Sequence, residues 1–279
     1  MFAKKMETYR KSINDFLENY LDSIKNKIEN NLFKSMKYSL LSGGKRIRPI
    51  LTLSVYDLLN KGEKTDEIYK FAAAVEMIHT YSLIHDDLPC MDDDTTRRGK
   101  PCNHVVYGED IALLAGDALL TQAFEIMSSV NNENINPKNI LKSINVLANC
   151  VGSAGMISGQ CFDIKLNSKN YDKKELLNIY NLKTSKLIAA STIIGAVLAG
   201  GNNEEISYIK KFGENIGIVF QLVDDILDNE TYNISLFKNP NVNELIQDLT
   251  YDAINAIKKI NGNIEFLENF AKFLASRVI

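Results

Sequence analysis

Two clusters of aspartates end apolar stretches of the chain, and both have the spacing of a site for a divalent cation. The first cluster occupies residues 86–94 and the second occupies residues 224–228. Two carboxylates about 4 Å apart repel each other by roughly 4 kcal/mol at an effective dielectric constant near 20, so a partly buried cluster needs cations or shifted pKa values. Hard oxygen ligands favour Mg²⁺, which usually binds through one or two carboxylates plus the phosphates of a substrate. The clusters therefore predict a Mg²⁺-diphosphate site with two acidic sides.

The second cluster has the more regular predicted geometry. Gln221, Asp224, Asp225 and Asp228 stand three and four residues apart, so a helix would present an amide and carboxylates on one stripe. The alternative is a solvated acidic face. The apolar neighbours of the cluster leave little room for such a face.

Pro89 interrupts the first cluster. Its ring conflicts with the carbonyl four residues earlier, so the helix should kink or end near Asp87. A turned chain would then bring Asp92 back toward Asp86. His79 lies two helical turns before Asp86 and would look into the same cavity, although a histidine packed in the core is an equal alternative. A helix end followed by an acidic surface loop is the alternative for the whole cluster.

Basic residues form three groups. Residues 43–49 place three cations beside two glycines, where backbone can approach an anion and arginine can hold two phosphate oxygens. Two further groups lie at residues 97–100 and 183–186. Any one of them alone is better explained as a basic surface. Together with two acidic clusters in a nearly neutral chain, they favour a site that balances metal ions against phosphates.

The elements that must position these residues are predicted to be helices. Proline is absent from residues 138–239, and alternating strand patterns are hard to find. Helices are predicted over residues 3–29, 31–42, 47–60, 64–87, 107–130, 138–167, 172–200, 203–229, 241–260 and 262–277, with one of the breaks at residues 168–170. No linker or internal repeat divides the chain. We therefore predict an all-α fold in one domain, residues 1–279, built as a bundle of about ten helices around a central cavity.

The bulk composition excludes several classes of function. The chain has 32 basic and 35 acidic residues and a net charge of -3, so no global field predicts nucleic-acid binding. Its four cysteines match no zinc-ligand spacing. The N-terminus lacks the apolar core of a signal peptide, and the longest apolar stretch, residues 187–200, is shorter than the roughly 20 residues that cross a bilayer. We expect a cytoplasmic protein without a membrane span.

Taken together, six blocks of sequence resemble the trans-isoprenyl diphosphate synthase family, and most closely its bacterial short-chain farnesyl diphosphate synthases. A lone DDxxD motif would be weak support, but six blocks in the family's order and spacing are strong. The blocks are residues 43–49, residues 76–94 with Arg97-Arg98-Gly99, residues 115–119, Gly159-Gln160 with Asp163, Lys183-Thr184, and residues 220–228.

The resemblance implies an isoprenoid synthase fold, a homodimer, and condensation of isopentenyl diphosphate with an allylic diphosphate, dimethylallyl or geranyl, using Mg²⁺. By position it assigns the metal to Asp86, Asp92, Asp224 and Asp228, with Asp87 in support. It assigns the allylic diphosphate to Arg97, Lys183, Thr184 and Gln221, and isopentenyl diphosphate to Gly44, Lys45, Arg48, His79 and Arg98. The aspartates Asp86, Asp87, Asp92 and Asp224, with Arg97 and Lys183, would be the catalytic set.

Product length is implied by the helix before the first cluster. Tyr81, five residues before Asp86, matches the aromatic floor of short-chain enzymes, with Ser82 beside it. The Pro89-Cys90 insertion matches the bacterial farnesyl type. Farnesyl diphosphate is the favoured product, and the geranyl and geranylgeranyl diphosphates remain alternatives.

One departure from the family follows the second cluster. The family continues through about twenty residues of Gly- and Lys-rich loop before a Thr-Tyr pair, with a lysine expected to hold the allylic diphosphate, whereas here Glu230 is followed directly by Thr231-Tyr232. Either the loop is deleted or a mobile segment is omitted, and omission is favoured because a loop that closes over substrate is mobile when the site is empty. The departure supports the rival hypothesis of a non-catalytic subunit of a heteromeric prenyl synthase.

Two other hypotheses, a terpene cyclase and a nucleotide-binding protein, are less consistent with the sequence. A class I terpene cyclase would not need the second-substrate residues Lys45, Arg48 and Arg98. Nucleotide binding is disfavoured because neither GxxxxGK[ST] nor GxGxxG occurs in the sequence.

Overall fold

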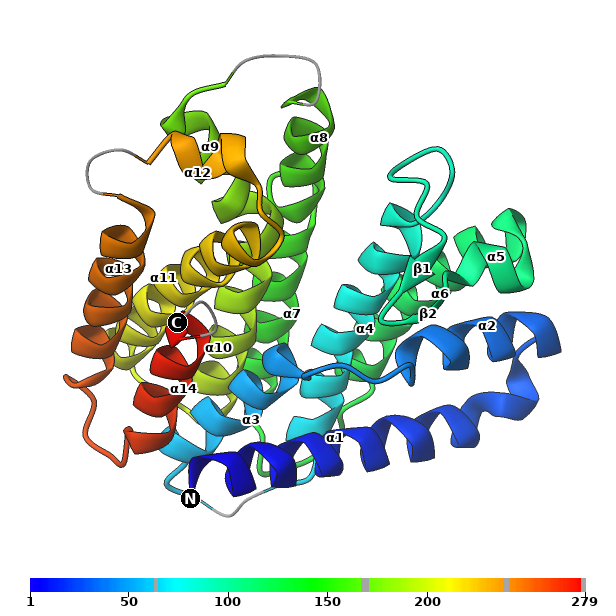
Figure 1. Cartoon of the computed structure of the whole chain (residues 1–279). Helices are drawn as coiled ribbons and strands as arrows, with labels where there is room; N and C mark the ends of the chain where they lie inside the picture. The colour runs from blue at the N-terminus through cyan, green and yellow to red at the C-terminus, as the bar shows by residue number, and fades with distance from the viewer. Residues whose placement is uncertain (63–64, 167–170, 238–240, 277–279) are drawn as a thin grey trace. The chain divides into compact units, whose positions relative to one another are not determined.

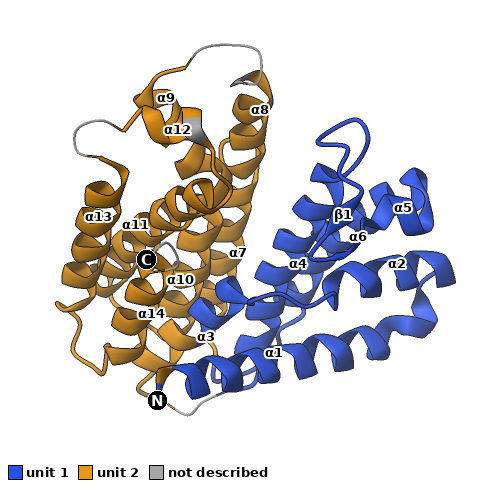
Figure 2. Cartoon of the chain, viewed as in Figure 1, with its two compact units in different colours: residues 1, 3–53, 65–134 blue, residues 2, 54–64, 135–279 orange. Residues whose placement is uncertain are grey.

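The computed structural model describes residues 1–62, 65–166, 171–237 and 241–276, and nearly all of its regular structure is helical (Figure 1). By its internal packing the chain divides into two compact units, one of residues 1, 3–53 and 65–134 and the other of residues 2, 54–64 and 135–279 (Figure 2). The helix Ile47–Leu59, α3, contributes residues to both units. The all-α fold is confirmed, whereas the prediction of a single domain stays a prediction.

Unit 1 is organised around a buried helix, α4 (Ile68–Asp86). Apolar side chains surround α4, and Phe71, Met77 and Ile78 are fully buried. Helix α6 (Glu109–Ser128) packs along α4. Gly116 permits the close approach, because an added Cβ there would lie 2.0 Å from Nε2 of His85. The helices and strands of the unit are α1 (Phe2–Ile24), a short 3-10 helix (Lys25–Lys27), α2 (Asn30–Leu40), α4 (Ile68–Asp86), β1 (Thr96–Arg97), β2 (Lys100–Pro101), α5 (Asn103–Tyr107) and α6 (Glu109–Ser128).

In unit 2, α7 (Pro137–Val151) and α11 (Asn203–Leu227) pack against α10 (Lys186–Leu198), which is buried along almost its whole length. Helix α11 approaches α10 closely at Gly213, where an added Cβ would meet Thr192 and Ala189, and approaches Ser185 of the preceding π-helix at Gly217. A capping box of Asn202 and Glu205 starts α11. The elements are α7 (Pro137–Val151), α8 (Met156–Leu166), α9 (Lys173–Ile179), a π-helix η2 (Tyr180–Ser185), α10 (Lys186–Leu198), α11 (Asn203–Leu227), α12 (Thr231–Ser235), α13 (Val242–Ile257) and α14 (Glu265–Ala275).

Several boundaries differ from the prediction. The predicted helix 138–167 is two helices, because the chain turns at residues 152–155 between α7 and α8. The predicted helix 172–200 contains the π-helical segment η2, and the β1–β2 hairpin and α12 were not predicted. The predicted break at residues 168–170 lies outside the described residues.

Two stretches of the described chain, Glu109–Ser128 and Pro137–Lys165, are long and apolar enough by composition to cross a membrane. Buried core helices pass the same test, and the second stretch is interrupted between α7 and α8. The prediction of no membrane span therefore stays a prediction.

Candidate functional site

The first aspartate cluster forms a closed turn at the end of α4. The helix ends at Asp86, and the N–H of Asp92 donates to the carbonyl of Asp86 at 2.9 Å. The N–H groups of Met91 and Asp93 both donate to the carbonyl of Leu88, at 2.8 and 3.2 Å. The predicted return of Asp92 toward Asp86 is confirmed. The backbones of two predicted metal ligands are thus held together before any cation binds.

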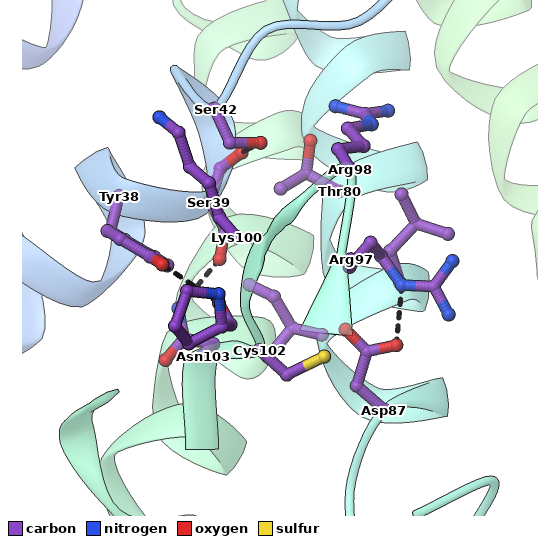
Figure 3. A pocket seen from close by; sticks show the side chains of 13 residues that line it. Tyr38, Ser39, Ser42, Thr80, Asp87, Arg97, Arg98, Lys100, Cys102 and Asn103 are labelled. Atoms are coloured by element: carbon purple, nitrogen blue, oxygen red, sulfur yellow. Dashed lines mark hydrogen bonds and ion pairs between the residues drawn. The ribbon is translucent and has the colours of Figure 1, made fainter. Parts of the chain in front are cut away.

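Asp87 has a different environment from its neighbour. Its carboxylate is 3% exposed and accepts a hydrogen bond from Nε of Arg97 at 2.5 Å (Figure 3). Asp94 holds the same guanidinium at 3.1 Å from Nη2. Burial, and then a hydrogen bond to Asp87, raise the pKa of the Cys102 thiol to about 12. Asp87 therefore positions Arg97, which fits the supporting role that the resemblance implies.

The pocket in Figure 3 lies beside this ion pair and is enclosed by α2, α4 and the β1–β2 hairpin. Asn103 is buried at its edge and donates to the backbone carbonyl of Ser35 and to Oγ of Ser39, at 3.0 and 2.7 Å. The hydroxyl of Tyr38 donates to the carbonyl of Pro101 at 2.8 Å. These bonds fix the hairpin that carries Arg97 to the helices of unit 1.

Arg46 differs from the other cations of residues 43–49. Its guanidinium is 3% exposed and donates to Oε1 of Glu76 at 2.6 Å, to the carbonyl of Leu40 at 2.7 Å and to Oδ1 of Asn14 at 2.9 Å. All three nitrogens are used inside the unit. Arg46 is therefore a structural residue, and its neighbours Lys45 and Arg48 remain the candidates for binding an anion.

Arg98 lies against the glycine-rich turn. Its Nη1 donates to the carbonyl of Gly43 at 2.6 Å, and a Cβ added to Gly44 would lie 2.9 Å from its Cζ. Gly44 also has a φ of +114°, which other residues rarely adopt. Burial lowers the pKa of Arg98, Glu76 opposes that shift, and the Arg46 and Arg97 charges add to it. The absence of a side chain at Gly44 thus makes room for this guanidinium.

His79 lies within this group of cations. Burial, and then the charges of Arg48 and Arg98, place its pKa well below the ordinary value, so the imidazole is neutral near pH 7. The structure thus brings together three of the residues that the resemblance assigns to isopentenyl diphosphate. A neutral imidazole among arginines is a hydrogen-bond donor in a region whose charges favour an anion.

Tyr81 packs its ring in the core, whereas Ser82 makes a hydrogen bond to the backbone of its own helix. Tyr81 is 6% exposed and packs edge-on against His85, with ring centroids 5.7 Å apart. Burial, and then Asp86, raise its pKa to about 12. The Ser82 hydroxyl donates to the carbonyl of His79 at 3.0 Å. Tyr81 therefore has the burial and the proximity to Asp86 that the predicted floor requires.

In unit 2, Lys183 is placed by helix α8. Its Nζ lies 2.5 Å from Oδ2 of Asp163. Gly159 lies one turn before Asp163 on α8, and a Cβ added to it would lie 2.4 Å from the backbone nitrogen of Lys183. The amide nitrogen and oxygen of Gln160 are buried without a hydrogen-bond partner among the described residues. The glycine and aspartate of the predicted block thus both act on Lys183.

Asp225 belongs to the predicted acidic stripe of the second cluster, but the resemblance assigns it no role of its own. It is 6% exposed and accepts hydrogen bonds from Tyr180, from Nε2 of Gln221 at 3.0 Å and from Nδ2 of Asn233 at 2.8 Å. The Thr184 hydroxyl donates to Oε1 of Gln221 at 2.8 Å. Two residues assigned to the allylic diphosphate are therefore held in one network. The helical spacing of the second cluster predicted that Gln221 lies on the same face as the aspartates. Nothing in the sequence indicated that Asn233 contacts Asp225.

Helix α11 ends just after its aspartates. Asp224 is partly buried and Asp228, the C-cap, is exposed. Asn229 has a φ of 58°, the N–H of Glu230 donates to the carbonyl of Asp225, and the N–H of Asn229 donates to that of Ile226. This pattern is a Schellman motif. It joins α11 directly to α12 at the point where the resembling family has its loop.

The aspartates have the donor chemistry that Mg²⁺ prefers, namely hard carboxylate oxygens. Among the described residues, no group of three or more histidine, cysteine, aspartate or glutamate side chains converges as a metal site. Mg²⁺ needs no such cage, because it keeps several waters and binds through one or two carboxylates plus substrate phosphates. The residues present therefore fit a cation that arrives with a diphosphate.

Comparisons with known proteins agree with this chemistry. The family model for polyprenyl synthetase matches residues 29–270. The farnesyl diphosphate synthase of Bacillus subtilis is 46% identical over 216 residues, which cover 77% of this chain and 72% of that protein. The large subunit 1 of the heterodimeric geranylgeranyl pyrophosphate synthase of Arabidopsis thaliana is 42% identical over 247 residues, which cover 86% of this chain and 66% of that protein.

A solved structure has the same fold. The FPP/GFPP synthase of Zymomonas mobilis, in its apo form, aligns with a TM-score of 0.89 at 30% identity and covers 98% of this chain and 99% of that one. The predicted isoprenoid synthase fold is thereby confirmed. With a family model that matches most of its length, the chain belongs to the polyprenyl synthetase family.

Proposed function

We propose that the protein joins isopentenyl diphosphate head-to-tail to an allylic diphosphate, dimethylallyl or geranyl, and releases farnesyl diphosphate. The observation that carries this proposal is the cluster of Arg48, Arg98 and neutral His79 in the same unit as the closed Asp86–Asp92 turn. The cations and His79 suit the diphosphate of isopentenyl diphosphate, which stays bound to its carbon. The aspartates of the turn suit Mg²⁺ on the allylic diphosphate, which must leave. Family membership supports the same reaction class.

The residues divide by substrate. Lys45, Arg48, Arg98 and His79 would bind isopentenyl diphosphate. Arg97, held by Asp87, would contact the allylic diphosphate. Arginine suits both tasks because its planar fork matches two phosphate oxygens and stays charged.

Unit 2 contributes a further set of groups for the allylic diphosphate. Lys183, Thr184 and Gln221 would contact it, and Asp224 and Asp228 would offer oxygen ligands to Mg²⁺. When bound, Mg²⁺ would neutralise charge on the leaving diphosphate. Lys183 in particular would supply positive charge where negative charge develops.

The reaction balances without a protein nucleophile. The allylic C–O bond breaks and diphosphate leaves with the electron pair, the double bond of isopentenyl diphosphate attacks the allylic carbon, and a proton is then lost. We assign the aspartates to hold Mg²⁺ and the cations to stabilise the leaving group, so no covalent intermediate with the protein is needed. The released diphosphate is the expected base, so no side chain is assigned to that role.

The farnesyl product rests on Tyr81. Its buried ring near Asp86 would limit the chain that grows into unit 1. The named relatives include both a farnesyl and a geranylgeranyl diphosphate synthase, so the product is part of the proposal. Action in the cytoplasm as a homodimer belongs to the proposal as well, and light scattering of the purified protein measures the oligomeric state.

A second candidate is a non-catalytic subunit of a heteromeric prenyl synthase. The observation in its favour is the direct connection between α11 and α12, which carries no lysine before α12. Its weakness is that the aspartates of both clusters are intact.

Diphosphate release measured under four conditions separates the candidates. The purified protein is given each substrate alone, both substrates with Mg²⁺, and both substrates with excess chelator. The enzyme proposal expects release only with both substrates and Mg²⁺. A subunit without activity of its own would release no diphosphate in any condition, which would overturn the proposal.

A further inference from the structure

Asn233 and Tyr171 have no role in the proposed chemistry, yet they end a chain of hydrogen bonds that leads to it. Asn233 lies on α12, and its Nδ2 donates to Oδ2 of Asp225 at 2.8 Å. Tyr171 precedes α9, and its hydroxyl donates to Oδ1 of Asn233. Beyond Asp225 the chain continues through Gln221 to Thr184. It therefore connects α12 with two residues assigned to the allylic diphosphate.

The carboxylate of Asp225 sets the direction of every bond in this chain. An ionised carboxylate only accepts hydrogen bonds, so Gln221 must turn its NH₂ group toward Asp225. The carbonyl oxygen of Gln221 then faces Thr184 and accepts the hydroxyl proton of that residue. If the amide of Gln221 turned by about 180°, its oxygen would face the Asp225 carboxylate, and two acceptors cannot form a hydrogen bond. The orientation of Thr184 thus depends on the position of Asp225.

Asp225 in turn is held from outside its own helix. Tyr180 on the π-helix and Asn233 on α12 both donate to Oδ2. Because the Tyr171 hydroxyl donates to the amide oxygen of Asn233, the NH₂ group of that amide is directed at Asp225. A second contact steadies the tyrosine, whose ring packs edge-on against Tyr232 with centroids 4.9 Å apart. Both oxygens of the carboxylate are therefore engaged.

We infer that Asn233, oriented by Tyr171, is a positioning residue that holds Asp225 and thereby turns Gln221 so that its second amide N–H can donate to the allylic diphosphate, with Thr184 holding the amide oxygen in that orientation. The inference rests on the proposed function and deepens it. The Schellman turn after Asp228 brings α12 close enough for this contact, because only three residues separate α12 from α11. In this chain the short connection places an amide where it secures the second aspartate cluster.

The test is a double-mutant cycle with Asn233→Ala and Tyr171→Phe in steady-state condensation. Loss of one hydrogen bond to a charged group predicts that Asn233→Ala lowers kcat/KM for the allylic diphosphate about tenfold, while KM for isopentenyl diphosphate is unchanged. Tyr171→Phe, which preserves the ring, should give a smaller loss of the same kind. In the Asn233→Ala background it should have no further effect, since its hydroxyl would have no amide left to orient.

Ser235→Ala is the matched control. It removes a hydroxyl from the same short helix, where Ser235 donates to the carbonyl of Tyr232, and should leave both kinetic constants unchanged. Circular dichroism of each variant verifies that it is folded, and the milder Tyr171→Phe decides the matter if Asn233→Ala does not fold. Equal changes in KM for both substrates, or additive effects in the cycle, would overturn the inference. An inactive wild-type protein would instead overturn the proposed function.

Discussion

Gly159→Ala is the substitution whose consequence the structure defines most closely. The added Cβ would lie 2.4 Å from the nitrogen and 2.7 Å from the Cα of Lys183, whereas ordinary contacts begin at 3.4 Å. Both contacted atoms are backbone, so no side-chain rotation relieves them. The π-helix must therefore move away from α8 by about 1 Å, the shortfall of the nearest contact. That movement also strains the 2.5 Å ion pair between Lys183 and Asp163.

The expected cost is mainly catalytic. A misplacement of about 1 Å lowers turnover by roughly 100-fold. Overpacking of a core typically costs about 1–3 kcal/mol, so the variant should remain folded but less stable. The assay compares kcat and both KM values at a temperature well below the unfolding midpoint, together with the free energy of unfolding from urea denaturation.

Gly213→Ala is the matched control for overpacking in unit 2. Its Cβ would lie 2.4 Å from Oγ1 of Thr192 and 2.8 Å from Cα of Ala189, between α10 and α11 and away from Lys183. It should destabilise the protein similarly and leave kcat nearly unchanged. Equal losses of kcat in the two variants, or full activity in Gly159→Ala, would refute the reasoning that close approach of α8 places Lys183.

Three further predictions concern unit 1. Tyr81→Ala should lengthen the product, because it removes the buried ring near Asp86, and chain sizing of the product measures this; an unaltered product would place the floor elsewhere. Glu76→Ala should cost about 3–5 kcal/mol in urea denaturation, because it leaves the buried Arg46 without its carboxylate; a cost below about 1 kcal/mol would contradict this reading. His79 stays neutral in the folded protein, whereas its pKa is near 6.5 in the unfolded chain. As the pH falls through about 6.5, only the unfolded chain binds this proton. The free energy of unfolding therefore falls there by up to about 1.4 kcal/mol per pH unit. His79→Gln should flatten that slope, measured between pH 7.5 and 5.5, and an unchanged slope would reject the assignment.

Much of the site could be predicted from local sequence. Pro89 forces the helix to end, so the turn that brings Asp92 back to Asp86 followed from sterics alone. The cations and aspartates were visible because charges beside apolar stretches need an explanation. The helices were visible because apolar residues recur at helical spacing.

The remaining features depend on contacts between distant residues. The π-helix around Lys183 has an ordinary helical sequence, and the structure places it against Gly159, 24 residues earlier. Asn233 bonds to Tyr171, which is 62 residues away. The break between α7 and α8 did have a local signal, Gly152 and Gly155, which the absence of proline outweighed in the prediction. Short helices such as α12 have too few residues to show a period.

The most direct test of the central claim is the fate of labelled isopentenyl diphosphate. The intact protein is incubated with geranyl diphosphate, labelled isopentenyl diphosphate and Mg²⁺, and the labelled prenyl chains are sized after removal of their diphosphate. We predict that the label appears in farnesol and that its appearance requires geranyl diphosphate. Label that stays entirely in isopentenyl diphosphate, with folded protein and both substrates present, would contradict the claim that this chain is a prenyltransferase.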